Sequence, residues 1–197
     1  MTAHHSMTET ELAVQAKLGS VPLRREQMAV VSTIHRAVTA IRQHLENSVL
    51  RDHDLTWTGF VVLWVLWIWG GMETRYVAEE AGISKGTLTG VAKTLSSRGL
   101  VDRLRHPSDG RLAVLRLTEE GERLMEELFP RFNTEEAFVA SPLETAEALS
   151  LADMLRRMVE HLETAGEQRR ESLRGDTPPP PRRSGRRAKG ESAQSSR

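Results

Sequence analysis

The fold is decided by one stretch, residues 83–117, with the sequence ISKGTLTGVAKTLSSRGLVDRLRHPSDGRLAVLRL. Its first half predicts a helix, because Leu88, Val91 and Leu95 recur at helical spacing. Ser84 suits the N-cap position, since its hydroxyl can accept a hydrogen bond from a backbone N–H at the helix start. This half therefore reads as a helix with one apolar face.

The second half of the stretch changes its period after Gly99, a residue that favours the end of a helix. Residues 100–105 and 112–117 alternate roughly every two positions, as strands do. Between them lies HPSDGR, at 106–111, in which proline, aspartate and glycine are turn formers. A β-hairpin is predicted to follow the helix directly.

Helix and hairpin together carry an excess of positive charge. Residues 84–117 contain seven basic and two acidic residues, although the whole chain has a formal net charge of zero. The outward face of the helix holds small polar and basic residues and no acid. Such a helix fits the major groove of DNA, and a basic hairpin can lie over phosphates or a minor groove.

These features resemble the winged helix-turn-helix of the MarR family of bacterial transcription regulators. Three motifs carry the resemblance, namely VAEEAGIS at 77–84, LSSRGLVDR at 95–103, and DGR at 109–111 with the exit LTEEG at 117–121. The last of them matches the family's D-x-R wing and its L-T-x-x-G exit. The resemblance implies a mainly α fold with a small β-hairpin wing, in which N- and C-terminal dimerisation helices flank the winged helix-turn-helix core.

The exposed side of this segment is predicted to contact DNA. Thr87 and Thr89 lie near the start of the recognition helix and can meet base edges or thymine methyl groups. In the family the wing arginine enters the minor groove beside an aspartate partner. The resemblance gives these places to Arg111 and Asp109, unless the two only stabilise their turn. The lysines suit phosphates or guanine, or else form a solvated face. The predicted DNA-binding residues are Ser84, Lys85, Thr87, Thr89, Lys93, Arg103, Arg105, Asp109 and Arg111.

Composition argues against several other classes of protein. The chain has no cysteine, which excludes disulfides, cysteine–zinc sites and thiol redox switches. Its longest apolar run, residues 60–69, is about half of what a membrane span needs, and no signal-peptide pattern is visible. No phosphate loop, nucleophile elbow or dinucleotide fingerprint occurs, and the histidines lack metal-site spacing. We expect a soluble cytoplasmic protein that is not an enzyme and needs no cofactor or metal.

The segments that flank the motif read as helices. Residues 24–50 carry one apolar stripe, which packs either on its own core or, as the resemblance suggests, across a dimer. Residues 72–82 are expected to form the scaffold helix of the motif. After the wing, a helix is expected from Thr118 to about 129, with a break at Pro130. A last helix is expected from an N-cap at Ser141.

The predicted organisation has three parts. The first is a flexible N-terminal segment, residues 1–22, in which residues 9–17 can form a short helix, and the last is a disordered Pro/Arg-rich tail, residues 168–197. Between them lies a MarR-like domain, 23–167, with the winged helix-turn-helix at about 55–128 and dimerisation helices at about 24–50 and 141–167. The basic tail either keeps the chain soluble or tethers it to DNA phosphates.

A ligand site is expected where the dimerisation helices meet the winged helix-turn-helix. The family often binds small aromatic or anionic molecules there. The helix at 56–69 places several aromatic side chains at steps of three and four. A packed core explains the same pattern, so both interpretations stay open. The predicted pocket residues are His35, Trp57, Phe60, Trp64 and Trp67.

The favoured function is that of a homodimeric, sequence-specific DNA-binding regulator, a repressor of nearby genes relieved by a small-molecule ligand. Its predicted partners are double-stranded DNA, a second copy of itself and a small aromatic or anionic effector. The alternative is a protein–protein interaction module that uses the winged-helix scaffold with its acidic helices or basic tail. Residues 118–163 hold twelve acids and four bases, which would suit such contacts.

Overall fold

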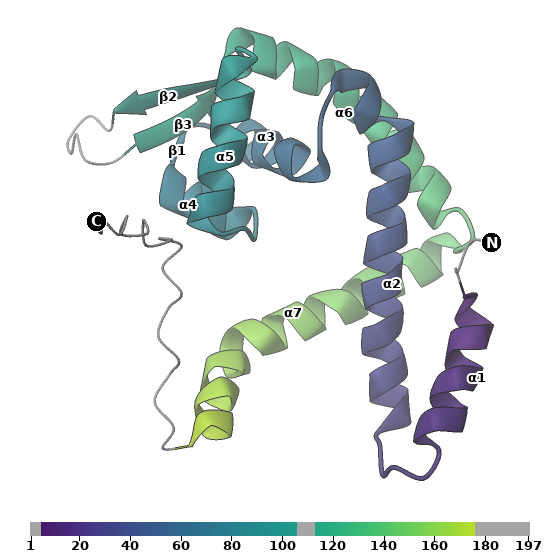
Figure 1. The fold of residues 1–197 in the computed structure, drawn as a ribbon. Coiled ribbons are helices and arrows are strands. Elements are labelled where there is room, and N and C mark those ends of the chain that lie inside the picture. The colour runs from purple at the N-terminus through teal and green to yellow at the C-terminus, as the bar shows by residue number, and fades with distance from the viewer. Residues whose placement is uncertain (1–4, 106–112, 176–197) are drawn as a thin grey trace, which may run out of the picture. The chain divides into compact units, whose positions relative to one another are not determined.

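A computed structural model describes residues 5–105 and 113–175 of the chain. The chain divides into two compact units, one reaching Ser141 and one beginning at Pro142 (Figure 1). The first unit contains α1 (Met7–Leu18), α2 (Arg25–Ser48), η1 (Leu50–His53), α3 (Trp57–Trp69), β1 (Met72–Glu73), α4 (Thr74–Glu80), α5 (Lys85–Ser97), β2 (Val101–Arg105), β3 (Ala113–Leu117) and α6 (Glu119–Ala140). The described part of the second unit is the helix α7 (Thr145–Arg174). The predicted fold class, mainly helical with a small hairpin wing, is confirmed.

The sheet has three strands in the order β1-β3-β2, all antiparallel. The predicted hairpin is present as β2 and β3, with Val101 opposite Leu117. The third strand, β1, was missed, because Met72 and Glu73 were assigned to the scaffold helix, which begins only at Thr74. A strand of two residues carries no periodicity, and only its pairing with Leu115 defines it.

The core of the first unit is built around α3. This helix is apolar on every side, so it can be buried by several neighbours at once. It packs against α5, α6 and β3. The largest fully buried side chains are Leu45, Leu50, Leu63, Leu66, Leu95, Leu115, Met125 and Leu128. The recognition helix and the wing are therefore held on one hydrophobic core.

The helix α6 runs through Pro130 without a break. The predicted interruption is therefore wrong. Proline removes one backbone hydrogen bond from a helix, but Pro130 is exposed, so water can hydrate the carbonyl that loses its partner. The buried Leu128 and Phe132 on either side keep this part of the helix on the core.

Both ends of α7 differ from the prediction. The N-cap is Glu144, whose backbone N–H is held by the carboxylate of Glu147 in a capping box. Ser141, the expected N-cap, instead ends α6, and its N–H donates to the carbonyl of Phe138. At the other end the helix continues to Arg174, so residues 168–174 are not part of a disordered tail.

A helix also occupies much of the segment that was expected to be flexible at the N-terminus. It is α1, and Ser6 and Glu9 form a capping box at its start. The hydrogen bond from the backbone N–H of Ser6 lowers the pKa of Glu9, which keeps its carboxylate charged at the positive end of the helix. Arg36 of α2 donates to the hydroxyl of Thr10 at 2.8 Å and ties α1 to its neighbour.

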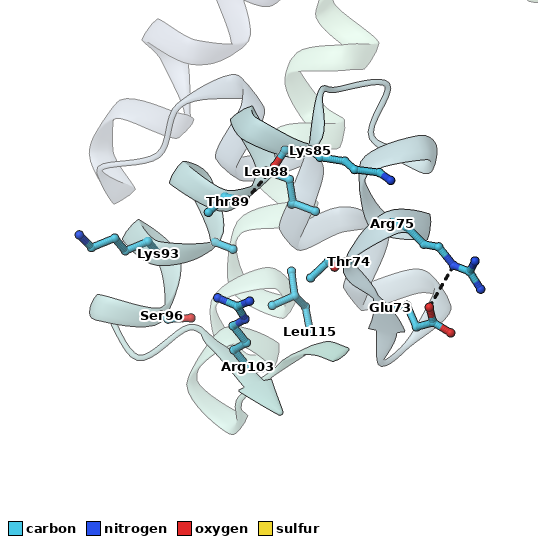
Figure 2. Close-up of a pocket in the computed structure, with 11 residues that line it drawn as sticks. Glu73, Thr74, Arg75, Lys85, Leu88, Thr89, Lys93, Ser96, Arg103 and Leu115 are labelled. Atoms are coloured by element: carbon cyan, nitrogen blue, oxygen red, sulfur yellow. Dashed lines mark hydrogen bonds and ion pairs between the residues drawn. The ribbon is translucent and has the colours of Figure 1, made fainter. Parts of the chain in front are cut away.

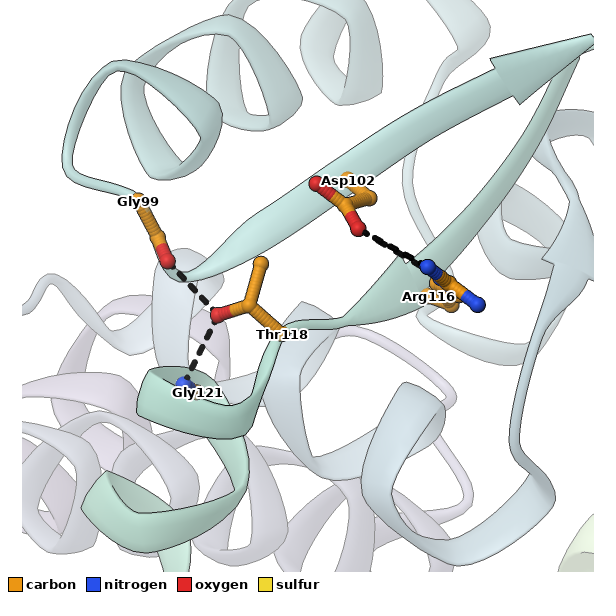
Figure 3. Close-up of polar contacts among 5 residues, drawn as sticks. All are labelled: Gly99, Asp102, Arg116, Thr118 and Gly121. Carbon is orange, nitrogen blue, oxygen red and sulfur yellow. Dashed lines mark hydrogen bonds and ion pairs between the residues drawn. The ribbon is translucent and has the colours of Figure 1, made fainter.

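Thr118 closes the base of the wing (Figure 3). Its hydroxyl donates to the carbonyl of Gly99 at 2.6 Å and accepts from the backbone N–H of Gly121 at 3.0 Å. The start of α6 approaches the backbone closely here, because a Cβ built on Gly121 would lie 2.2 Å from the carbonyl oxygen of Leu100. The hydrogen bonds of Thr118 and the close packing at Gly121 therefore explain why the LTEEG motif has threonine and glycine at these positions.

No helix in the described ranges 5–105 and 113–175 is long and apolar enough to cross a membrane.

We predict that Gly121→Ala lowers the free energy of unfolding by about 2 kcal/mol or more, because the new methyl group collides with backbone rather than with a side chain. Urea unfolding followed by circular dichroism measures the change. The matched control is Gly90→Ala, where the added Cβ meets nothing within 4 Å and helix propensity should rise. Equal stability of Gly121→Ala and the parent would show that α6 does not approach Leu100 so closely.

Candidate nucleic-acid interface

The helix α5 presents a polar face to solvent. One side of the helix faces the core and carries the buried residues Leu88, Ala92 and Leu95. The opposite side therefore faces solvent. Ser84 caps the helix by accepting from the N–H of Thr87 at 3.0 Å, as the sequence predicted. The seven predicted contact residues that the structure describes are all exposed, and they are Ser84, Lys85, Thr87, Thr89, Lys93, Arg103 and Arg105.

The hydroxyl groups of the two threonines on this face already make hydrogen bonds within α5 or to its N-cap. The hydroxyl of Thr89 donates to the carbonyl of Lys85 at 2.9 Å. The hydroxyls of Thr87 and Ser84 lie 2.8 Å apart. A threonine hydroxyl that already donates its proton retains acceptor capacity and a methyl group. This combination suits an amino group or a thymine methyl in the major groove.

A groove of about 450 Å³ separates α5 from the start of α4 and from the sheet (Figure 2). Leu88 and Leu115 form part of its apolar floor, and Arg103 extends across it from β2. Four basic side chains and a single acid lie around it. The full lining is Glu73, Thr74, Arg75, Lys85, Leu88, Thr89, Ala92, Lys93, Ser96, Arg103 and Leu115. The excess of cations suits a phosphate backbone that passes between the helix and the wing.

Arg75 belongs to this basic rim and was missed in the sequence. Its Nε pairs with the carboxylate of Glu73 at 3.0 Å, and its guanidinium lies 4.3 Å from the centre of the Tyr76 ring. These contacts fix a cation at the start of α4, close to the recognition helix. A lone arginine in a scaffold helix gave no signal in the sequence, because only the fold brings it to the groove that Lys85 and Lys93 also line.

The wing is described only at its base. Arg103 and Arg105 lie on β2 and are exposed, as expected for phosphate contacts. Asp102 and Arg116 face each other across the hairpin and form an ion pair at 3.2 Å (Figure 3). The predicted wing-tip residues, Asp109 and Arg111, lie outside the described residues.

Arg98 connects the end of the recognition helix to a distant turn. Its guanidinium donates to the carbonyls of Asp54 at 2.5 Å and of His53 at 2.7 Å. Asp54 has a left-handed backbone, with a φ of 50°, which directs this turn toward the helix. These two hydrogen bonds, called the Arg98 brace below, connect the C-terminal end of α5 to the end of η1.

The predicted pocket residues divide into two groups. Trp57, Phe60 and Trp64 line a groove between α3 and α6, and Trp67 packs on Trp64 with ring centres 5.8 Å apart. His35 is exposed on α2 and is not among the residues that line this groove. Ligand binding in this groove stays a prediction.

Comparison with known proteins agrees with this geometry. The family model described as "MarR family" matches residues 55–112. The helix-turn-helix-type transcriptional regulator YwaE of Bacillus subtilis is 31% identical over 164 residues, which cover 82% of this chain and 96% of that protein.

Two solved structures are similar in fold and sequence. Bordetella bronchiseptica BpsR, whose DNA binding is regulated by 6-hydroxynicotinic acid, is 27% identical with a TM-score of 0.62. The similarity covers 66% of this chain and 98% of BpsR. Streptomyces coelicolor PcaV, solved with its natural ligand, is 29% identical with a TM-score of 0.60, over 73% of this chain and 94% of PcaV.

We predict that Arg98→Lys weakens binding to a DNA duplex by about tenfold, or about 1.4 kcal/mol. Lysine keeps the charge but lacks the planar fork that reaches two carbonyls together. A brace acts on geometry, so the dependence of affinity on salt should not change. Fluorescence anisotropy at several salt concentrations measures both quantities.

Arg123→Lys is the matched control for this substitution, because Arg123 is exposed on α6 and pairs with the carboxylate of Glu120 one turn away. It should leave DNA affinity unchanged. If Arg98→Lys binds DNA as tightly as the parent, Arg98 acts as a simple positive charge and the brace has no role in binding.

Proposed function

The chain belongs to the MarR family of transcription regulators, and from this premise we propose that it binds a specific operator as a homodimer. Its simplest action is repression of nearby genes in the cytoplasm, relieved when a small molecule binds. The observation that carries the proposal is the exposed face of α5, which contains no acid and borders a basic groove. This pattern of charge and shape suits duplex DNA.

In this proposal the contacts fall into two kinds. Thr87 and Thr89 read base edges in the major groove, where hydroxyl and methyl groups can tell bases apart. The cations around the groove bind phosphates and set the register of the helix. The proposed phosphate contacts are Lys85, Lys93, Arg103, Arg105 and the added Arg75, and the wing tip with Asp109 and Arg111 is assigned to the minor groove.

Exposed apolar faces support the homodimer. On α2 the side chains of Met28, Val31 and Val38 are exposed. On α7 no residue is buried, although the helix has an apolar stripe. The exposed members of that stripe are Leu151, Met154, Met158 and Leu162, which follow one another at steps of three and four. Helices with such faces gain stability when a partner covers them.

The groove between α3 and α6 is the proposed place for an effector. It lies on the helix that also supports the recognition helix, since α3 packs against both α5 and α6. A ligand that favours one arrangement of these helices would change the affinity for DNA. Regulation by ligands among similar regulators is consistent with this role.

We expect the protein to bind the DNA upstream of its own coding region tightly, and a scrambled duplex of equal length weakly. Fluorescence anisotropy at several salt concentrations tests this, and the affinity for the upstream DNA should fall steeply as salt rises. Equal affinity for both duplexes would contradict sequence-specific recognition. An absence of binding at low salt would favour a protein-interaction module instead.

We expect a dimer in sedimentation equilibrium at micromolar concentration. Leu151→Glu, which places a charge on the apolar stripe of α7, should shift the equilibrium toward the monomer by about tenfold or more, because a buried charge opposes association. Glu163→Gln, which changes an exposed polar residue of the same helix, is the control. A parent protein that sediments as a folded monomer would overturn the dimeric architecture.

A further inference from the structure

We propose that the aromatic groove between α3 and α6 binds a small organic cation, such as an aromatic or alkyl ammonium compound, with Glu136 as its counter-charge. This deepens the proposed function, because it names the chemical class of the effector for the groove described above. It also reverses the charge expected from the sequence, which favoured an aromatic or anionic molecule.

The groove has a size and a lining suited to a small molecule. Its volume is about 350 Å³, within the range usual for ligand sites. Its walls come from one face of α3 and one face of α6. The lining residues are Trp57, Phe60, Val61, Trp64, Phe129, Phe132 and Glu136. Glu136 is thus the one charged residue among otherwise apolar and aromatic side chains.

The aromatic rings form a packed wall with part of its surface open. Phe60 and Phe132 stack at 4.2 Å and are buried, so they form the rigid back of the groove. Trp57, Trp64 and Phe129 are only half-buried, which leaves part of each ring accessible. Ring faces carry partial negative charge and attract ammonium groups, most strongly at tryptophan.

The charges around the groove favour a cation. Glu136 accepts a hydrogen bond from the side-chain amide of Asn133 at 3.0 Å, but forms no ion pair with any lysine, arginine or histidine in the described ranges. Its neighbour Glu135 is already paired with His44 at 2.7 Å, and Glu46 with Arg42 at 3.7 Å. One carboxylate therefore remains available at the mouth of the groove.

An anionic ligand would find no positively charged side chain among the residues that line the groove. None of the lining residues is basic. His35, which was predicted for the pocket, is exposed on α2 and is not among the residues that line the groove. A carboxylate ligand would meet the negative faces of the rings and the charge of Glu136. The physical preference of the groove is therefore for a positively charged aromatic or alkyl group.

The test uses the full-length protein without DNA and three probes of nearly equal size, namely benzylammonium, benzyl alcohol and benzoate at pH 7. Tryptophan emission follows binding, since Trp57 and Trp64 line the groove. We expect saturable binding of benzylammonium, at least tenfold weaker binding of benzyl alcohol, and no binding of benzoate. Tighter binding of benzoate than of benzylammonium would overturn the proposal.

Glu136→Gln isolates the counter-charge. It should weaken benzylammonium by about tenfold and leave benzyl alcohol unchanged. Glu127→Gln is the matched control, because it removes the same charge from an exposed position of α6 that does not line the groove. If both variants bind benzylammonium equally, Glu136 is not the counter-charge and the proposal fails.

Two further outcomes separate this proposal from the proposed function. If benzylammonium binds as expected but leaves DNA affinity unchanged, the cation site stands and its regulatory role fails. If no probe binds and the tryptophan emission changes only with protein concentration, a second copy of the chain covers the groove and the cation site is wrong. Operator binding is measured independently of either result.

Discussion

The winged helix depends on a close approach between the start of α6 and the backbone at Leu100. Only a residue without a side chain fits at Gly121, where a Cβ would lie 2.2 Å from a carbonyl oxygen. Thr118 uses this approach to join the end of the recognition helix to the start of α6, through the carbonyl of Gly99 and the N–H of Gly121. The wing, the end of the recognition helix and the start of α6 therefore meet at one closely packed, hydrogen-bonded junction.

This junction matters because the recognition helix has a low intrinsic helix propensity. The helix α5 has glycines at two exposed positions, Gly86 and Gly90, and glycine lowers helix propensity by about 1 kcal/mol relative to alanine. The braces at its C-terminal end offset this weakness. Arg98 donates to two carbonyls at the end of η1, and Leu95, one turn before it, is buried. A helix held in this way keeps its polar face outward with little freedom to tilt.

The helix α3 packs against the recognition helix and also forms one wall of the aromatic groove. It contributes buried residues to the core under α5 and aromatic residues to the groove beside α6. Arg131 of α6 pairs with Asp52 of η1, and Arg98 donates to the carbonyl of the next residue, His53. Because α3 packs against both α5 and α6, it is a physical route by which occupancy of the groove would act on DNA binding.

Local periodicity, capping and charge were enough to predict the helix–turn–hairpin order, the N-cap at Ser84, the basic face and the family. Tertiary structure alone decided the strand β1, the continuity of α6 through Pro130 and the ends of α7, since pairing and burial override local preference there. It also decided which distant charges meet. Arg75 joins the basic rim and Glu136 joins the aromatic groove, while His35 does not. Such meetings depend on how helices pack, and no spacing within one segment encodes them.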